Sequence, residues 1–449
     1  MSTPISDAVN RLSPSTCFVP GVLVLALLLP SLLGVTVTLA VLAGIAISVL
    51  CSRHPRIALT LWLLVVCFVP FWFGATDPFY LSPTALMSLL VLGAMLLFNR
   101  WEPNKIDVCI LVFFACCAIL VVVGWARPGD VTSALSQWLL SFLVGRLLVQ
   151  RVGTDFTYRV IAVLFTVVAV CAVAEFVLRW NPYYELTNAT VQYRLWGHSQ
   201  LRGGIIRSEW AFGHSIALAN SVALAIPIVF ATTFRTRVKV VCIALMLAAA
   251  VVSFSRSGMI SAAFAVFLTL FFMKGRSDSR SGMLVLAGGV VGAALASPWI
   301  VGIFEQAGSE AEDSAQYRSK LNGLIPTMNP MGIANGYLES DGVPYFSGFK
   351  SIDSTFVLLG LSFGLFVAAA AILGTVWLAV RVISRTATPP MIGVAAVVPA
   401  LFTVALITQF GALLWFFVGM VSLTGARRRE SEPHRFRHDR QSQLTGAAA

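Results

Sequence analysis

The chain has 449 residues, of which 58% are hydrophobic and only 11% are charged. An ordinary soluble domain has roughly 45–50% apolar and 25% charged residues, so this composition excludes a soluble globular protein and predicts a polytopic membrane protein. The formal net charge is +11. Because the basic residues are scattered among short segments, we attribute this charge to orientation and to contact with anionic membrane lipids, and we expect no nucleic-acid partner.

Apolar segments of spanning length recur along the chain. A spanning helix needs about 20 apolar residues, and the gaps between charged residues are repeatedly of this size. Two stretches, 18–50 and 391–423, are too long for one span, and we interpret each as two helices that meet at Pro30–Gly34 and Thr408–Gly411. The predicted fold class is an all-α polytopic integral membrane protein with about 14 transmembrane helices. We place them near 18–32, 35–51, 57–74, 83–98, 106–125, 133–149, 159–178, 213–233, 239–254, 257–273, 283–302, 354–380, 391–407 and 409–424.

The positions of Lys and Arg predict the orientation. With the N-terminus inside, 22 of the 31 basic residues, Arg146 among them, fall in inner loops and tails, as the positive-inside rule requires. Both termini are then cytoplasmic. The first apolar region lacks a small-x-small cleavage site and is expected to remain as an anchor. The predicted parts are a cytoplasmic tail 1–17, a helical bundle 18–302 with an outer loop 179–212, a large outer loop 303–353, C-terminal spans 354–424 and a basic cytoplasmic tail 425–449.

Several classes of site have no signal in the sequence. All 8 cysteines lie in or at the edge of apolar spans, so neither a disulfide framework nor a Cys/His metal site is expected. There is no Gly-rich phosphate loop and no evident internal repeat, which disfavours a nucleotide-driven pump and an inverted-repeat transporter. We expect no metal and no cofactor.

The first candidate site lies in the outer loop 179–212. The sequence Arg202-Gly-Gly-Ile-Ile-Arg207-Ser-Glu209-Trp-Ala-Phe-Gly213-His214 runs directly into the span that starts near 213. Backbone N–H groups at a helix N-terminus already favour an anion, so Arg207 beside this end could hold a phosphate. The alternative is that these are ordinary interfacial residues that snorkel or pair.

The second candidate is the short outer turn Ser253-Phe-Ser-Arg256-Ser-Gly258. Arg256 breaks the inside bias of the positive charges, and ionisable groups at membrane depth are costly enough to suggest function. It could instead be a snorkelling interfacial residue. Glu175, near the outer end of the span 159–178, could be the buried partner of one of these arginines, and a structural ion pair is the favoured interpretation of it.

The third candidate lies in and after the large outer loop, where Tyr317-Arg318 is followed by Asn329-Pro-Met-Gly332 and then by Asp353-Ser354 at the start of a span. Asp353 could equally be only a helix N-cap. Within that span, Gly360-x-x-x-Gly364 is interpreted as a helix-packing motif.

Taken in chain order, these residues resemble the O-antigen ligase and O-antigen polymerase superfamily of lipid-linked glycan transferases. The shared elements are Phe-Gly-His before a span with Pro227, a Ser-Arg-Ser-Gly at a span end, an Arg followed by Asn-Pro-x-Gly, and a polar pair before a helical Gly, all within residues 200–370. The resemblance implies a C-type glycosyltransferase architecture in a bacterial cytoplasmic membrane. It also implies that Arg207, Arg256 and Arg318 bind the diphosphate of a polyprenyl-diphosphate-linked glycan.

One position departs from the family pattern. Ligases of the family usually have His where this chain has Asp353, and His is the natural general base for an acceptor hydroxyl. The departure favours a polysaccharide polymerase over a ligase. Asp353 or Glu209 is the expected base, and His214 is expected to position the acceptor or to act as an alternative base.

The sequence therefore predicts a metal-independent transfer of a glycan from a polyprenyl-diphosphate donor to an acceptor sugar hydroxyl on the outer face. Guanidinium groups take the place of a metal ion at the leaving diphosphate. The alternative is a secondary transporter or flippase for a polyprenyl-linked or anionic substrate. A transporter is expected to carry its charges along a cavity near the midplane, whereas convergence of the charges at the outer helix ends favours the transferase.

Overall fold

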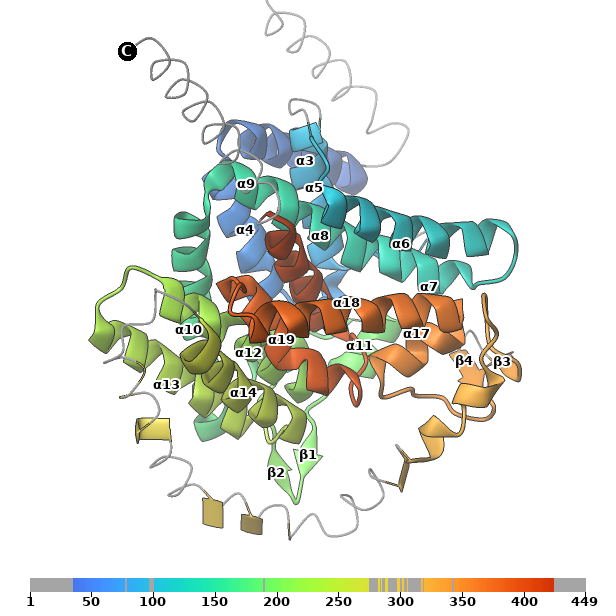
Figure 1. Cartoon of the computed structure of the whole chain (residues 1–449). Helices are drawn as coiled ribbons and strands as arrows, with labels where there is room; N and C mark the ends of the chain where they lie inside the picture. Colours follow the sequence, from blue (N-terminus) through green and yellow to red (C-terminus); the bar gives the residue numbers. More distant parts are fainter. Residues whose placement is uncertain are drawn as a thin grey trace, which may run out of the picture.

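The computed structural model describes residues 35–76, 79–96, 101–188, 190–273, 319–340 and 343–423, with single positions between 282 and 317. Within these ranges the protein is mostly helical (Figure 1). Two short antiparallel hairpins lie outside the helical part. Their strands are β1 (Leu201–Arg202), β2 (Ile205–Ile206), β3 (Tyr337–Ser340) and β4 (Val343–Phe346).

The first described helices follow the expected spans closely. They are α3 (Val35–Arg53), α4 (Pro55–Phe68), α5 (Pro83–Leu96) and α6 (Lys105–Val122). α4 ends before the expected 74, because Pro70 follows and a short 3-10 turn, η1 (Phe71–Phe73), takes over. α6 begins with a capping box, in which the Asn104 side chain accepts from the backbone of Asp107 and the Asp107 side chain accepts from the backbone of Asn104.

One continuous helix, Pro128–Val152, covers the expected span 133–149. It consists of α7 (Pro128–Ser133), a π-helical stretch η2 (Ala134–Leu139), α8 (Leu140–Leu143), a second π-helical stretch η3 (Val144–Leu148) and α9 (Val149–Val152). Gly153, with φ of 93°, ends it, and α10 (Thr154–Leu178) starts at the next residue. Such a positive φ suits Gly because it has no Cβ.

The centre of the molecule is α12 (Ser215–Ala231), in which every residue but Ile216 is buried. α10, α13 (Thr236–Val252), α14 (Arg256–Phe272) and α19 (Pro389–Leu401) all pack on it. Glycines allow the closest contacts: a Cβ at Gly258 would lie 2.2 Å from the Cβ of Ala219, and one at Gly393 would lie 2.6 Å from the Leu224 carbonyl oxygen. Small residues thus bring α14 and α19 against the central helix.

The expected single span 354–380 is wrong, because the structure breaks it into two helices. They are α17 (Thr355–Phe363) and α18 (Leu365–Ile383), separated only by Gly364, whose φ is 98°. Hydropathy does not distinguish a continuous apolar helix from one interrupted at a glycine. Two helices are present at the C-terminal side, as expected, but the predicted junction at Thr408–Gly411 is wrong: α19 ends at Leu401, residues 402–407 form the connection, and Thr408–Gly411 are the first turn of the helix Thr408–Leu423.

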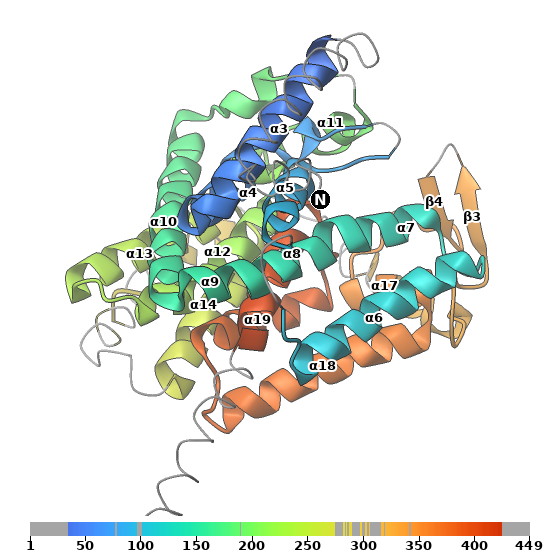
Figure 2. The same cartoon turned by 90° about the horizontal axis from the view of Figure 1, so that it is seen from above.

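Four helices of the described part are long and apolar enough to cross a membrane, and shorter apolar helices accompany them. The four are Lys105–Val122, Pro128–Val152, Thr154–Leu178 and Leu365–Ile383. α6, the helix Pro128–Val152 and α18 lie side by side (Figure 2). The expected span 18–32 lies outside the described residues, and only single positions of 283–302 are described.

Segments that the sequence assigns to the outer loops or to the outer ends of spans contact one another. The side-chain amide of Gln409, in the first turn of the helix Thr408–Leu423, donates to the carbonyl oxygens of Val69 (3.1 Å) and Ala211 (2.7 Å), so three segments distant in sequence meet at one side chain. The Asn188 amide donates to the Trp72 carbonyl oxygen at 3.0 Å. This arrangement agrees with helices that alternate in direction.

Arg146 lies in the helix Pro128–Val152, within the expected span 133–149, and not in the inner loop to which the count of charges assigns it. It is 1% exposed and its guanidinium donates to the carboxylate of Asp107, which is completely buried, at 2.9 Å. Next to it, a Cβ at Gly145 would lie 2.1 Å from the Phe416 carbonyl oxygen, so the last helix crosses here at very short range. The buried ion pair thus fixes the junction of three helices.

Candidate functional site at the outer helix ends

The candidate site is built on residues 179–214, which connect α10 to α12. This segment contains η4 (Pro182–Glu185), α11 (Val191–Trp196), the β1–β2 hairpin and a 3-10 turn, η5 (Trp210–Phe212). The hairpin projects at the lower edge of the molecule in Figure 1, beyond the end of α14. The hairpin turn has Gly203 and Gly204 at positive φ, a conformation that glycine adopts without strain.

Two arginines of this segment hold the end of α13. The Arg207 Nε donates to the Ser253 carbonyl oxygen at 3.0 Å, and the Arg202 Nη1 donates to the Phe254 carbonyl oxygen at 2.8 Å. The backbone N–H of Ser208 donates to the Val252 carbonyl oxygen at 3.2 Å. Carbonyl groups at a helix C-terminus lack partners within the helix, so the arginines satisfy them and bring positive charge to the turn after α13.

The turn after α13 leads directly into Arg256, the first residue of α14. The hydroxyl of Ser255 caps this helix by accepting from the Gly258 N–H at 3.1 Å. Arg256 is exposed, whereas Arg207 is buried. The structure therefore brings the backbone of Arg256 beside the turn that the guanidinium groups of Arg202 and Arg207 contact.

Two carboxylates lie behind this turn. Glu175, near the end of α10, accepts from the Asn181 amide at 2.8 Å and from the N–H groups of Glu209 and Trp210 at 3.2 and 2.7 Å. Glu209 is completely buried, and its Oε1 accepts from the N–H of Gln200 at 3.1 Å. Burial, together with the negative charge of Glu175, raises the pKa of Glu209 to about 8. The Glu209 carboxyl group therefore carries its proton at neutral pH.

His214 is the N-cap of α12. Its Nδ1 accepts from the Ile216 N–H at 3.1 Å. Burial and the nearby charges of Arg207 and Arg202 lower the pKa of His214 to about 3, so the ring is neutral. Because Nδ1 uses its lone pair as an acceptor, the ring proton is on Nε2, which can only donate. This favours the positioning role of His214 over the role of a general base.

Asp353 and Arg318 belong to the other segment that the sequence assigns to the outer side. Asp353 is half-buried, accepts from the Ser351 hydroxyl at 3.0 Å and lies near Tyr317. The N-cap of α17 is Ser354, not Asp353, since the Ser354 hydroxyl accepts from the Val357 N–H at 3.3 Å. Arg318 lies outside the described residues. Arg207, Glu209, His214 and the turn at Arg256 thus form one cluster, and Asp353 is not among the residues that contact it.

The Asn329-Pro-Met-Gly332 motif closes the break between α17 and α18. The N–H groups of Leu365 and Phe366, at the start of α18, donate to the carbonyl oxygens of Asn329 (2.9 Å) and Pro330 (3.1 Å). In return, the Gly332 N–H donates to the carbonyl oxygen of Phe363, at the end of α17, at 2.9 Å. The motif therefore supplies both helix caps, which is a structural role.

Gln200 is a site residue that the sequence interpretation missed. Its backbone carbonyl accepts from the Arg207 N–H at 2.9 Å, and its side-chain oxygen accepts from Arg207 Nη1 and the Ser215 hydroxyl, each at 3.4 Å. The backbone N–H of Gln200 also donates to the Glu209 carboxylate. Gln200 therefore connects Arg207, Glu209 and the start of α12. The only sequence signal for this role is that Gln200 is a polar residue two positions before the Arg202-Gly-Gly turn.

In the part of the chain that the structure describes, no three His, Cys, Asp or Glu residues come together as a group that could hold a metal ion. No protein-family model, no curated protein and no solved structure matches this chain.

Proposed function

We propose that the protein is a polyprenyl-diphosphate-dependent glycosyltransferase of the O-antigen ligase and polymerase type. It moves a glycan from the lipid-linked donor to an acceptor sugar hydroxyl at the outer face of a bacterial cytoplasmic membrane. The observation that carries the proposal is the convergence of Arg202 and Arg207 on the turn that precedes Arg256. Polymerisation of repeat units is favoured over ligation, because Asp353 stands where ligases of the family usually have His.

The arginines suit a diphosphate leaving group. As the bond between the sugar and the diphosphate breaks, negative charge grows on the phosphate oxygens, and fixed guanidinium donors stabilise it. Arg256 is the exposed member of the three and is assigned the direct contact. Arg207 is engaged with the Ser253 carbonyl, so we assign it to positioning the turn and to the positive potential there.

Activation of the acceptor hydroxyl is assigned to Asp353 or Glu209. A base with a pKa near the working pH removes a proton effectively once it is ionised; with a pKa of about 8, Glu209 is ionised in only a minor fraction of molecules at neutral pH, and that fraction would be the active one. Glu209 is buried, so the acceptor would have to approach through the Gln200 side of the cluster. Asp353 is the more accessible of the two carboxylates. To act as the base, the segment before α17 that carries it would have to approach the cluster of Arg207, Glu209 and His214.

One observation favours the second candidate, a secondary transporter or flippase. Transporters bind substrates and ions at broken helices, and the helix pair α17–α18 is broken at Gly364. In this protein, however, residues 329–332 already occupy the two helix ends at the break. Those ends are therefore not available to a substrate, which weakens the transporter proposal.

A transfer assay with a polyprenyl-diphosphate-linked glycan tests the proposal. Arg256→Lys keeps the charge but loses the planar pair of donors. We expect turnover to fall roughly ten- to a hundredfold, equivalent to about 1.5–3 kcal/mol for a hydrogen bond to a charged group. Arg194→Lys, at an exposed arginine of the segment 179–214 that the proposed mechanism does not use, is the control and should be silent. Wild-type turnover by Arg256→Lys would contradict the role of this residue.

Three further measurements separate the alternatives. Turnover that survives excess chelator supports the arginine mechanism, whereas a loss of turnover that added Mg²⁺ restores contradicts it.

Comparison of Asp353→Asn with Glu209→Gln identifies the base, since only replacement of the true base lowers turnover with donor binding intact. Deletion of the gene distinguishes the outcomes for the cell: single lipid-linked units indicate a polymerase, lipid-linked polymer indicates a ligase, and an unchanged surface glycan contradicts both.

A further inference from the structure

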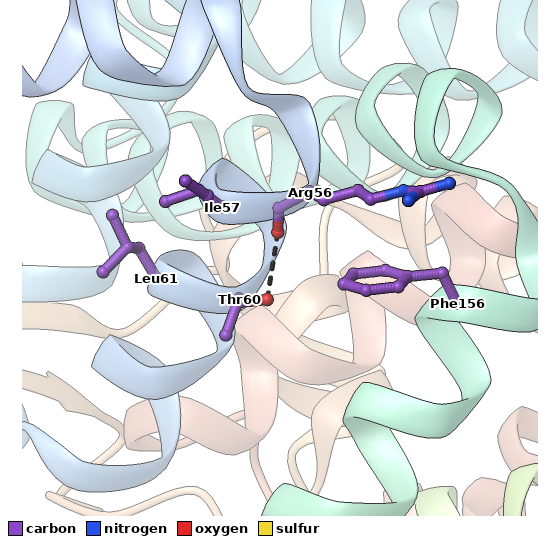
Figure 3. A pocket seen from close by; sticks show the side chains of 5 residues that line it. All are labelled: Arg56, Ile57, Thr60, Leu61 and Phe156. Carbon is purple, nitrogen blue, oxygen red and sulfur yellow. Dashed lines mark hydrogen bonds between the residues drawn. The ribbon is translucent and has the colours of Figure 1, made fainter.

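A pocket of about 200 Å³ lies between the first turns of α4 and α10, at the predicted inner side (Figure 3). Arg56, Ile57, Thr60, Leu61 and Phe156 line it. The Arg56 guanidinium carbon lies 5.4 Å from the centroid of the Phe156 ring. A ring face at this distance holds a guanidinium by cation–π attraction and leaves its N–H edges available to a further acceptor.

The pocket has positive charge and no acid of its own. Arg56 is exposed, and no carboxylate among the described residues forms an ion pair with it. The adjoining ends of α3, α9 and α10 add three exposed arginines against one exposed acid, Asp155. These arginines are Arg53, Arg151 and Arg159. The surroundings therefore attract an anion, and clusters of this kind at the cytoplasmic side of a membrane protein attract anionic headgroups.

An apolar stripe leads from the pocket along both helices. On α4, Ile57 and Leu64 are 43% and 36% exposed, and on α10, Val163 and Val167 are 51% and 41% exposed. Spacings of seven and eleven residues keep these side chains on the face of Ile57 and Phe156. α4 and α10 pack against each other, so at a rise of about 1.5 Å per residue the stripe extends for about 10 Å along α4 and about 16 Å along α10.

We propose that this pocket binds an anionic phospholipid of the inner leaflet. The phosphate contacts the Arg56 guanidinium, and one acyl chain lies along the stripe of Ile57, Leu64, Val163 and Val167. A free phosphate would use the cation but not the stripe, and a zwitterionic lipid would use the stripe but place its own cation beside four arginines. This site lies at the opposite ends of α4 and α10 from the candidate transferase site, and it does not depend on the proposed function.

The test uses the purified full chain in detergent, stripped of lipid and titrated with phosphatidylglycerol. Native mass spectrometry counts the bound lipid, and thermal unfolding reports stabilisation, because a ligand that binds the folded state raises the midpoint. Phosphatidylcholine with the same acyl chains and inorganic phosphate are the two reference probes. We expect phosphatidylglycerol to bind at least tenfold more tightly than either.

Variants of the protein decide whether the pocket is responsible. Arg56→Gln should weaken phosphatidylglycerol binding at least tenfold, and Phe156→Leu should weaken it severalfold. Arg385→Gln makes the same charge change at an exposed arginine at the predicted inner end of α18 and should bind as the wild type does. If Arg56→Gln does not fold, Arg56→Lys takes its place, with an expected loss of threefold or more.

Two outcomes would overturn the proposal. Wild-type binding by Arg56→Gln, or by Arg56→Lys in its place, would show that the guanidinium does not hold the headgroup. An equal loss in Arg385→Gln would show attraction to the basic surface as a whole, with no site at the pocket.

Discussion

The backbone N–H of Glu209 donates to the carboxylate of Glu175 at 3.2 Å, so one buried acid supports the peptide group of another. The same carboxylate accepts from Trp210 and Asn181. Glu175 therefore fastens the outer segment to the end of α10. The acid that the sequence suggested as a partner of an arginine is instead an acceptor for three N–H donors.

Removal of this acceptor should destabilise the protein. Glu175→Met preserves the side-chain length but leaves three donors without their acceptor, and one unsatisfied buried group costs about 1–3 kcal/mol. We expect a loss of at least about 2 kcal/mol in the free energy of unfolding, measured by denaturant titration of tryptophan fluorescence in detergent. Glu185→Gln changes an exposed acid and should cost little. Equal stability of Glu175→Met and the wild type would show that the three contacts are dispensable.

The pKa of Glu209 predicts the direction of the pH dependence. Folding raises it from 4.5 to about 8, so between these values the folded state holds a proton that the unfolded state has lost. Its contribution to stability is complete below pH 4.5 and is lost as the pH rises through about 8. The unfolding midpoint of the wild type should fall between pH 5 and 9, and that of Glu209→Gln should fall less. Parallel curves for the two proteins would refute the link to Glu209.

Gly364 should tolerate no side chain. A Cβ there would lie 2.6 Å from the Met331 Cα and 2.8 Å from the Pro330 carbonyl oxygen, and φ is 98°. Gly364→Ala should therefore lower the yield of folded protein or the unfolding midpoint strongly. Gly374→Ala, in the middle of α18 with open space around it, is the control and should be neutral or slightly stabilising. Size-exclusion profiles and unfolding midpoints provide the comparison.

Asp107 and Arg146 should be strongly coupled. Removal of one partner of a buried ion pair typically costs about 3–5 kcal/mol, because the other charge stays buried without compensation. We expect Asp107→Leu and Arg146→Met each to be severely destabilising and the double variant to recover part of the loss. A double-mutant cycle on unfolding free energies measures this coupling, and additive losses would argue against it.

Hydropathy predicted α10, α12 and α14 to within a few residues, because the interruptions between these apolar segments carry charge. It could not predict the break at Gly364, since the groups that cap the two helix ends come from residues 329–332, about thirty positions earlier. The same limit applies to Arg146, which a count of charges places in a loop because its partner Asp107 is distant in sequence.

At the candidate site, the sequence predicted the residue types but not their contacts. Arg207, Glu209 and His214 lie close together because they belong to one short segment. Their engagement with Ser253, Gln200 and the start of α12 depends on helices that meet only in the folded chain. Asp353 is distant in sequence from Arg207, Glu209 and His214, so residue spacing alone cannot predict whether it contacts them.

The caps at the Gly364 break also impose an order on the assembly of the protein. Residues 329–332 are synthesised before α17 and α18, and domains and segments generally fold in the order in which they emerge. In the predicted orientation, which assigns residues 303–353 to the outer side, the capping motif can therefore be in place across the membrane when the two helices enter it. Until it has crossed, the N–H groups of Leu365 and Phe366 would face hydrocarbon without an acceptor, at a cost of several kcal/mol each. In that orientation, we expect export of the loop to precede the insertion of the broken helix pair.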